Sequence, residues 1–380
     1  MKKIKVMTVF GTRPEAIKMA PLVKVLDSQK WCEPKVVVTG QHREMLDQVL
    51  QVFDIIPDYD LNIMSQGQTI TDITVKVLTG FKKVLEDESP DIVLVHGDTT
   101  TTFAAGLASF YAQIPVGHVE AGLRTWNKYS PFPEEMNRQL TDDFTDLFFA
   151  PTPDSKENLL KENKPENQIY ITGNTAIDAM KYTIKQEYSN ELIDISNKEK
   201  RRILVTMHRR ENLGDPMAQV FRAIKRITAE HQNTEVIFPM HRNPAVRDLA
   251  ISILGDNPQV RLVEPFDVVD FQNILARCEL VLTDSGGIQE EAPSLAVPVL
   301  VLRDTTERPE GVKAGTVSLI GTGEDDVYNK VNELLTNKEA YNKMAHAENP
   351  YGDGEASQRI ADAIAFYFGI YTEKPLEFGK

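Results

Sequence analysis

Short apolar segments alternate with segments of mixed apolar and charged residues along most of the 380-residue chain. In the first half, the segments expected to be buried strands are 3–10, 35–40, 91–98, 114–122 and 147–151. The helical patterns that separate them are 14–29, 69–87 and 99–112. Continuous runs of Val, Ile and Leu that alternate with helices predict a parallel sheet covered on both faces.

The pattern starts again in the second half of the chain. The expected strands are 201–208, 234–241, 259–265, 278–284 and 297–303, and the expected helices are about 215–230, 267–277 and 324–346. Segment 185–202 is polar and charged and contains no expected strand, so a linker and a long exposed helix both fit it. The sequence therefore predicts an α/β protein of two Rossmann-like domains, 1–170 and 171–364, facing each other across a ligand cleft.

Composition narrows the class of protein. The formal net charge of −14 opposes nucleic-acid binding, although an anionic small ligand is possible where basic residues gather. The two cysteines, Cys32 and Cys278, are far apart, so they predict neither a disulfide framework nor a metal site and favour the cytoplasm. No apolar segment is long enough to span a membrane. Gly11 and Arg13 interrupt the first apolar segment, so we expect a strand there rather than a signal peptide.

Unusual polar residues follow the ends of many expected strands. They are Gly11–Arg13, Gln41–Arg43, His96–Asp98, His118–Glu120, His208–Arg210, His241–Asn243 and Asp284–Gly286. In an open parallel sheet, ligands bind at the edge formed by the carboxyl ends of the strands. We therefore expect each domain to present binding residues at that edge.

Three acidic residues in the first half are candidates for proton transfer. Asp98 and Glu120 each follow an expected strand, and Glu134 follows Pro133 at an expected helix start. Asp98 could instead be only a helix cap, and Glu134 only a first-turn acid that suits the helix dipole. Carboxylates gathered at one sheet edge raise one another's pKa, which suits proton transfer near neutral pH.

Basic and glycine-rich segments indicate an anion site. Arg13 and Lys18 stand in the first turns of the helix after Gly11, where an anionic ligand or plain solvation would explain their charges. The segment "VLTDSGGIQEEA" (281–292) places Ser285, Gly286 and Gly287 between a strand and a helix, as in many phosphate-binding turns. No Gly-x-Gly-x-x-Gly follows the first strand and no Walker lysine follows these glycines, so no dinucleotide, ATP or other cofactor is expected. No tight metal-ligand spacing occurs either.

Several motifs occur in a fixed order over most of the chain. They are "FGTRPEAIKMAP", "TGQHREML", "VHGDTTTT", "HVEAGLRT", "PFPEEMNR", "GNTAIDA", "MHRREN" and "DSGGIQEEAP". Together they resemble the non-hydrolysing bacterial UDP-N-acetylglucosamine 2-epimerases. The resemblance implies a fold of the GT-B type in which the last helix returns to the first domain. Residues 354–369 form an amphipathic helical pattern of suitable length, and the helix that joins the first domain is expected at about 365–380.

The resemblance also implies a reaction, the interconversion of UDP-GlcNAc and UDP-ManNAc in the interdomain cleft. UDP would leave as C2 loses its proton, 2-acetamidoglucal would form, and UDP would add back. By resemblance the catalytic residues would be Asp98, Glu120, Glu134 and His208, with the three carboxylates as acid and base groups. The residues that would bind UDP and its diphosphate are Arg13, Lys18, Ser285, Gly286, Gly287 and Glu291.

A second UDP-GlcNAc, acting as an allosteric activator, would bind beside the active site in such a family member. By resemblance Gln41, Arg209 and His241 would line that second site, with Glu134 close enough to couple the two. A homodimer in the cytoplasm that supplies ManNAc for a cell-surface polysaccharide is also implied. The alternatives are a hydrolysing epimerase, a GT-B glycosyltransferase and a non-catalytic nucleotide-sugar sensor.

We expect the adjacent acids Glu290 and Glu291 to have different roles. The ribose of a nucleotide sugar offers hydroxyl donors, so Glu291, one turn along the helix from the glycines, is expected to accept hydrogen bonds from it. Adjacent helical residues do not share a face, so Glu290 is expected to point elsewhere.

Overall fold

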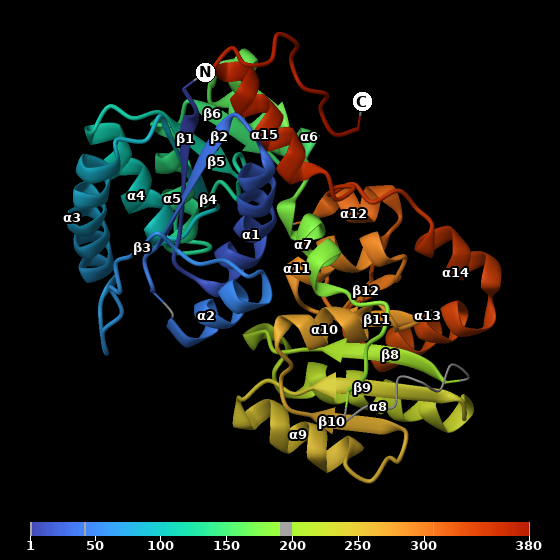
Figure 1. The fold of residues 1–380 in the computed structure, drawn as a ribbon. Helices are drawn as coiled ribbons and strands as arrows, with labels where there is room; N and C mark the ends of the chain where they lie inside the picture. The colour runs from blue at the N-terminus through green and yellow to red at the C-terminus, as the bar shows by residue number, and fades with distance from the viewer. Residues whose placement is uncertain (1, 42, 191–199, 307, 380) are drawn as a thin grey trace. The chain divides into compact units, whose positions relative to one another are not determined.

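The structure, a computed structural model, describes residues 2–41, 43–190, 200–306 and 308–379. The chain divides into two compact units (Figure 1). Unit 1 comprises Met1–Tyr182 with Gly352–Lys380, and unit 2 comprises Thr183–Tyr351. Each unit is a parallel sheet packed against helices, so the predicted α/β class with two Rossmann-like domains is confirmed.

Unit 1 is built on a sheet of seven strands in the order β3-β2-β1-β4-β5-β6-β7. Its strands are β1 (Ile4–Phe10), β2 (Cys32–Val38), β3 (Tyr59–Asp60), β4 (Ile92–His96), β5 (Val116–Val119), β6 (Leu147–Ala150) and β7 (Ile169–Ile171). Its α-helices are α1 (Arg13–Ser28), α2 (Arg43–Val52), α3 (Ile70–Glu88), α4 (Thr100–Tyr111), α5 (Glu134–Asp143), α6 (Pro153–Lys161), α7 (Thr175–Thr183) and α15 (Ala356–Tyr367). All the strands and helices predicted for the first half are present, with ends shifted by a few residues.

The apolar strands of unit 1 are buried on both faces, as their continuous Val and Ile runs predict. On one face, Phe10 and Val38 pack with Leu22 of α1 and Ile360 of α15. On the other face, the strands pack with α3 and α4, through residues such as Phe81. Figure 1 shows α1 and α15 on one side of the sheet and α3 and α4 on the other.

Unit 2 is built on a sheet of six strands in the order β10-β9-β8-β11-β12-β13. Its strands are β8 (Arg201–Thr206), β9 (Thr234–Pro239), β10 (Val260–Val263), β11 (Leu280–Thr283), β12 (Val299–Val301) and β13 (Val317–Leu319). Its α-helices are α8 (Asp215–Glu230), α9 (Pro244–Leu254), α10 (Val268–Leu275), α11 (Gly286–Glu291), α12 (Pro309–Ala314), α13 (Glu324–Thr336) and α14 (Lys338–Ala345). The five strands predicted for this half are confirmed, and β13 adds an edge strand.

The single helix predicted at 324–346 is two helices, because Asn337 interrupts it. The backbone of Asn337 is extended, with φ −106° and ψ 98°, and its side chain accepts hydrogen bonds from the N–H groups of Glu339 and Ala340. An Asn side chain that caps the next helix competes with continuation of the first one. α13 therefore ends where α14 begins.

The border between the units differs from the predicted border after residue 170. β7 pairs with β6, and α7 continues in the same unit, which ends at Tyr182. The carboxylate of Asp178 on α7 accepts hydrogen bonds from the N–H groups of Ala356 (3.2 Å) and Ser357 (2.6 Å) at the start of α15. The chain returns to unit 1 at Gly352, before the segment expected at 365–380, and α15 lies within the amphipathic pattern at 354–369.

The predicted linker at 185–202 is described only in part, because residues 191–199 lie outside the described residues. Its last two residues, Arg201 and Arg202, begin β8. At its other end, Lys185 and Tyr188 are held to α10. The Lys185 N–H donates to Asn273 (2.9 Å), and the Tyr188 hydroxyl donates to Asp270 (2.5 Å).

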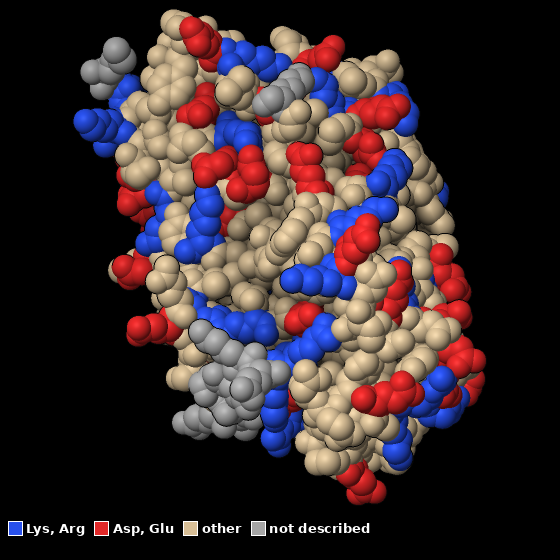
Figure 2. All heavy atoms as spheres, turned by 90° about the vertical axis from the view of Figure 1, so that its right-hand side faces the viewer, with Lys and Arg blue, Asp and Glu red and all other residues tan. Residues whose placement is uncertain are grey.

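Charged side chains of both signs are mixed on the surface shown in Figure 2. Among the described residues on the face shown in Figure 2, acidic and basic side chains alternate, and neither sign covers a broad continuous area. Within the described part of the chain, no helix is both long and apolar enough to cross a membrane.

Candidate active site

Sheet order decides which polar segments of unit 1 become neighbours. β4 lies between β1 and β5 in a parallel sheet, so the carboxyl ends of all three strands open at the same edge. The turns that follow them carry Arg13, Asp98 and Glu120. This edge is the expected location of a ligand in a doubly wound sheet.

Glu120 is in contact with a cation, an amide and a histidine at the edge of unit 1. Its Oε2 forms an ion pair with Nζ of Lys18 and accepts a hydrogen bond from Nδ2 of Asn174 at 3.2 Å. Nε2 of His96 lies 3.8 Å from the same oxygen. The backbone of Glu120 is left-handed, with φ +67°, a conformation that costs energy in a residue other than glycine and is often found at functional sites.

Asp98 lies beside this group and is held by α5. Its Oδ2 accepts a hydrogen bond from Nη2 of Arg138 at 2.5 Å, and its carbonyl oxygen accepts one from Nδ2 of Asn137 at 2.9 Å. Burial raises the pKa of Asp98, Arg138 and Lys18 act against that rise, and the negative charge of Glu120 adds to it. The net result is a carboxyl group whose pKa lies above its usual range, as proton transfer near neutral pH requires.

A further carboxylate, Glu15, holds the framework of this edge together. Its Oε2 accepts hydrogen bonds from the N–H groups of Gly11 (3.0 Å) and Thr12 (2.7 Å). Its Oε1 accepts from the hydroxyls of Thr99 (2.6 Å) and Thr102 (3.1 Å). Glu15 therefore joins the turn before α1 to the start of α4. The capping-box spacing from Thr12 to Glu15 was the signal in the sequence that could have identified it.

Glycine is required at position 11 for a steric reason. A Cβ there would lie 2.0 Å from the Thr39 hydroxyl oxygen and 2.7 Å from that of Thr101. The Thr101 hydroxyl also donates to Oε1 of Gln41 at 3.1 Å, so Gln41 lies against the start of α4. The other two predicted residues of this unit, Arg13 at the start of α1 and Glu134 at the start of α5, are both partly exposed.

The edge of unit 2 is organised by Asp284, which is fully buried after β11. Its Oδ2 accepts hydrogen bonds from the N–H groups of His208 and Arg209, both at 2.9 Å, and from Nδ2 of Asn212 at 3.1 Å. The rings of His208 and His241 stack with centroids 5.4 Å apart. The structure thus brings together His208, Arg209 and His241, which follow strands β8 and β9.

Ser285, Gly286 and Gly287 form the turn into α11, with Ser285 at the cap position. Glu291, at the other end of this short helix, accepts a hydrogen bond from Nε2 of Gln272 at 3.1 Å. Its other carboxylate oxygen lies 3.9 Å from the point where a Cβ on Gly287 would stand, so it lies near the glycine turn.

Glu290 points away from Glu291, as the helical geometry predicts. Its side chain is buried, and its Oε1 accepts a hydrogen bond from Nε of Arg308 at 2.6 Å. No local pattern indicates that Gln272 and Asn212 are partners here, because each comes from a segment distant from the carboxylate that it contacts.

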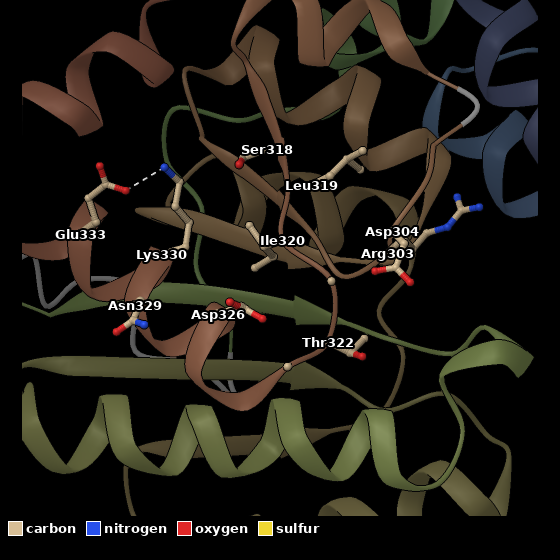
Figure 3. Close-up of a pocket in the computed structure, with 12 residues that line it drawn as sticks. Arg303, Asp304, Ser318, Leu319, Ile320, Thr322, Asp326, Asn329, Lys330 and Glu333 are labelled. Atoms are coloured by element: carbon tan, nitrogen blue, oxygen red, sulfur yellow. Dashed lines mark hydrogen bonds and ion pairs between the residues drawn. The ribbon is translucent and has the colours of Figure 1, made fainter.

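A separate hollow of about 690 Å³ opens beyond β12 and β13 (Figure 3). Its lining includes Arg303, Asp304, Asp326 and the ion pair of Lys330 with Glu333 at 2.7 Å. None of the predicted site residues lines it. Among the described residues, no cluster of three or more His, Cys, Asp or Glu side chains is arranged to hold a metal ion. Each unit thus has one candidate site, at the edge of its own sheet.

Comparison with known proteins identifies the family to which the chain belongs. The family model described as UDP-N-acetylglucosamine 2-epimerase matches residues 24–365. The chain belongs to the UDP-N-acetylglucosamine 2-epimerase family. The resemblance predicted from the sequence motifs, to the non-hydrolysing bacterial members, is thereby confirmed.

Individual relatives agree over the whole chain. The UDP-N-acetylglucosamine 2-epimerase of Bacillus subtilis is 58% identical over 378 residues, which cover 100% of this chain and 99% of that protein. A crystal structure of a UDP-N-acetylglucosamine 2-epimerase matches with a TM-score of 0.95, 56% identity and full coverage of both chains. The Neisseria meningitidis enzyme, solved bound to UDP-GlcNAc, matches with a TM-score of 0.83 and 47% identity, covering 96% of this chain and 100% of that one. The predicted GT-B type of fold is confirmed by these structures, and the predicted ligand cleft stays a prediction.

Proposed function

We propose that the protein epimerises UDP-GlcNAc at C2 to UDP-ManNAc, reversibly and without net hydrolysis. The observation that carries the proposal is the edge of unit 1, where Glu120 pairs with Lys18 beside Asp98, whose pKa is raised. Family membership points to the same substrate, because relatives are named for this reaction and one was solved with UDP-GlcNAc bound.

The reaction proceeds by elimination and re-addition of UDP. The proton on C2 is too weakly acidic for direct removal, because no carbonyl is attached to C2 to stabilise a carbanion. Breaking the C1–O bond as C2 loses its proton avoids that carbanion and gives 2-acetamidoglucal and UDP. UDP then adds back to C1, and C2 regains a proton on its opposite face.

The carboxylates of unit 1 supply the proton transfers. Asp98, Glu120 and Glu134 act as the acid and base groups, and the raised pKa of Asp98 suits a group that both takes and returns a proton. Lys18 and Arg13 offer positive charge to the diphosphate, on which negative charge grows as the C1–O bond breaks.

Unit 2 holds the UDP. Donors on His208 and in the turn Ser285–Gly287 bind the diphosphate, and Glu291 accepts hydrogen bonds from the ribose hydroxyls. Support comes from the position of Glu291 near the glycine turn and from the anchoring of the His208 backbone by Asp284. A ribose hydroxyl bound to a carboxylate makes a charge-assisted hydrogen bond, which is stronger than a neutral one.

A second UDP-GlcNAc binds as an activator at a site lined by Gln41, Arg209 and His241, with Glu134 coupling it to the active site. The contacts of His208 support such coupling within unit 2. Its ring stacks on His241, and its N–H shares one carboxylate oxygen of Asp284 with the N–H of Arg209. A change at Arg209 or His241 would therefore alter the contacts that hold His208.

The protein acts as a cytoplasmic homodimer that supplies ManNAc for a cell-surface polysaccharide. Apolar side chains exposed on the packed pair α3 and α4 support self-association. They include Ile70, Val75, Phe110 and Tyr111. Sedimentation should give twice the mass of the 42.8 kDa chain, and Val75→Glu should shift the mass toward that of one chain.

Incubation with UDP-GlcNAc alone, followed by NMR in D₂O, tests the proposed reaction. UDP-ManNAc should accumulate, deuterium should enter at C2 of the sugar, and free UDP should not be a net product. Net release of UDP with ManNAc would instead identify a hydrolysing epimerase. A requirement for an acceptor would identify a glycosyltransferase, and binding without turnover a sensor. Product formed without exchange at C2 would rule out elimination and re-addition.

A further inference from the structure

A chain of buried charged side chains lies behind the turn that carries Asp98. His118, which is fully buried on β5, contacts Asp142 of α5 through Nδ1 at 2.6 Å. The other oxygen of Asp142 accepts a hydrogen bond from Nη2 of Arg124 at 2.6 Å, and Arg124 continues to Glu162 at 2.6 Å. The described active-site chemistry uses none of these four side chains.

The hydrogen bonds of His118 indicate that its ring carries both protons. Its Nε2 lies 2.7 Å from the carbonyl oxygen of Gly97, which can only accept. Its Nδ1 faces Asp142, which Arg124 keeps as a carboxylate and which can therefore also only accept. A neutral imidazole has one donor and one acceptor nitrogen, so only an imidazolium satisfies both contacts.

Two groups near His118, Asp142 and His96, have shifted pKa values. Burial acts to raise the pKa of Asp142, but the charges and hydrogen bonds of His118 and Arg124 outweigh it and hold that pKa below its usual range. His96 lies on the neighbouring strand β4, where it is in register with Val119. Burial lowers the pKa of His96 to about 3, and the charges of Lys18 and His118 contribute to the lowering while Glu120 opposes it. His96 is therefore neutral.

Each residue of the turn after β4 is held by a different partner. The carbonyl of Gly97, whose φ is +67°, accepts from His118. Asp98 is held through its carbonyl by Asn137, and the Thr99 hydroxyl donates to Glu15. His118 thus fixes the peptide group that directly precedes Asp98.

We propose that His118, as an imidazolium paired with the Asp142 carboxylate, which Arg124 also contacts, is a positioning residue for Asp98. The inference rests on the proposed role of Asp98 in proton transfer. A charge-assisted hydrogen bond to the Gly97 carbonyl restrains the turn more strongly than a neutral donor would. An imidazolium in the core has a desolvation cost that a histidine needed only for packing would avoid by staying neutral.

The test compares His118→Gln with the wild-type enzyme. Gln can donate to the Gly97 carbonyl but carries no charge, so the turn should loosen. Because misplacing a catalytic group by about 1 Å can cost about 100-fold in rate, kcat should fall by about 100-fold while KM and the affinity for UDP stay within about threefold. The control is His231→Gln in unit 2, where His231 bonds only to Asn332 among the contacts of its ring that are described (2.9 Å), and it should leave kcat unchanged.

Two further measurements keep the inference testable if His118→Gln does not fold. In ¹⁵N-histidine-labelled wild-type enzyme, His118 should show protons on both ring nitrogens at neutral pH, and a single ring N–H would overturn the proposal. Asp142→Asn removes the countercharge and should lower kcat in the same way without changing KM.

The parallel variant Asp98→Asn separates this inference from the proposed function. If Asp98→Asn keeps its kcat, the proposed role of Asp98 fails. If Asp98→Asn loses activity but a folded His118→Gln keeps its kcat, the positioning role of His118 fails and the proposed function stands.

Discussion

The edges of the two sheets occupy the same topological position and differ in their chemistry. In unit 1 the turns after the strands present carboxylates to one another and to cations, as in Glu120 with Lys18 and Asp98 with Arg138. In unit 2 the only carboxylate directly after β11, Asp284, is buried and accepts from the backbone of His208 and Arg209. The same fold thus gives one edge suited to moving protons and another suited to holding an anion, because function depends on the site rather than on the fold.

The largest expected effect comes from removing the acid and base groups of unit 1. Asp98→Asn, Glu120→Gln and Glu134→Gln should each lower kcat about 100- to 10,000-fold, the range typical of a lost general acid or base. Calorimetry should show UDP binding retained, because the proposed UDP contacts lie mainly in unit 2.

A matched control for these variants is Glu157→Gln on α6, whose side chain is 65% exposed in a surface ion pair. It should leave kcat unchanged. Normal turnover in all three active-site variants would contradict the proposal that the edge of unit 1 performs the proton transfers.

The next effect in size separates the adjacent acids of unit 2. Glu291→Ala should weaken UDP binding about 10- to 100-fold, because a hydrogen bond to a charged group contributes about 1.5–3 kcal/mol. Glu290→Ala should change UDP affinity much less and lower the melting temperature instead, because it removes the buried carboxylate that accepts a hydrogen bond from Arg308. Calorimetry and thermal unfolding of both variants would show the contrast, and equal losses of UDP affinity would contradict it.

A smaller effect should show that Asp284 stabilises the backbone at His208 and Arg209 and does not take part in catalysis. Asp284→Ala leaves the N–H groups of His208 and Arg209 without their acceptor and should lower the free energy of unfolding by about 1–3 kcal/mol. With saturating substrate, kcat should fall far less than in Asp98→Asn. Denaturant unfolding would measure the first effect, with Asp325→Asn as a control, since Asp325 is 83% exposed in its ion pair with Arg226. A kcat as low as that of Asp98→Asn would place Asp284 among the catalytic groups.

The smallest expected effect concerns acid stability. The pKa of Asp142 is lowered in the folded state, so its contribution to stability is present above the unfolded pKa of about 3.9 and is lost as the pH falls through the folded value. Asp142→Asn should therefore make the melting temperature less dependent on pH below about 5 than it is in the wild type. Scanning calorimetry from pH 7 to pH 3 would show this. An unchanged pH dependence would mean that His118 and Arg124 do not lower the pKa of Asp142.

Local patterns were enough to predict most elements of the fold. The strands and helices follow from the spacing of apolar residues, and parallel pairing places the polar residues after each strand at one edge. Asn337, which divides a predicted helix, was missed because a polar residue within an amphipathic pattern is as easily read as part of its exposed face.

Local periodicity is enough to predict which residues stand at the carboxyl ends of the strands. Which of these residues meet depends on the three-dimensional arrangement of the strands and helices. Lys18 and Glu120 are 102 positions apart, and Ala356 reaches Asp178 across 178 positions. Such contacts depend on strand order and on burial of the α15 face, and no local pattern encodes either. For the same reason the charge on His118 became visible only when Gly97 and Asp142 were found on opposite sides of its ring.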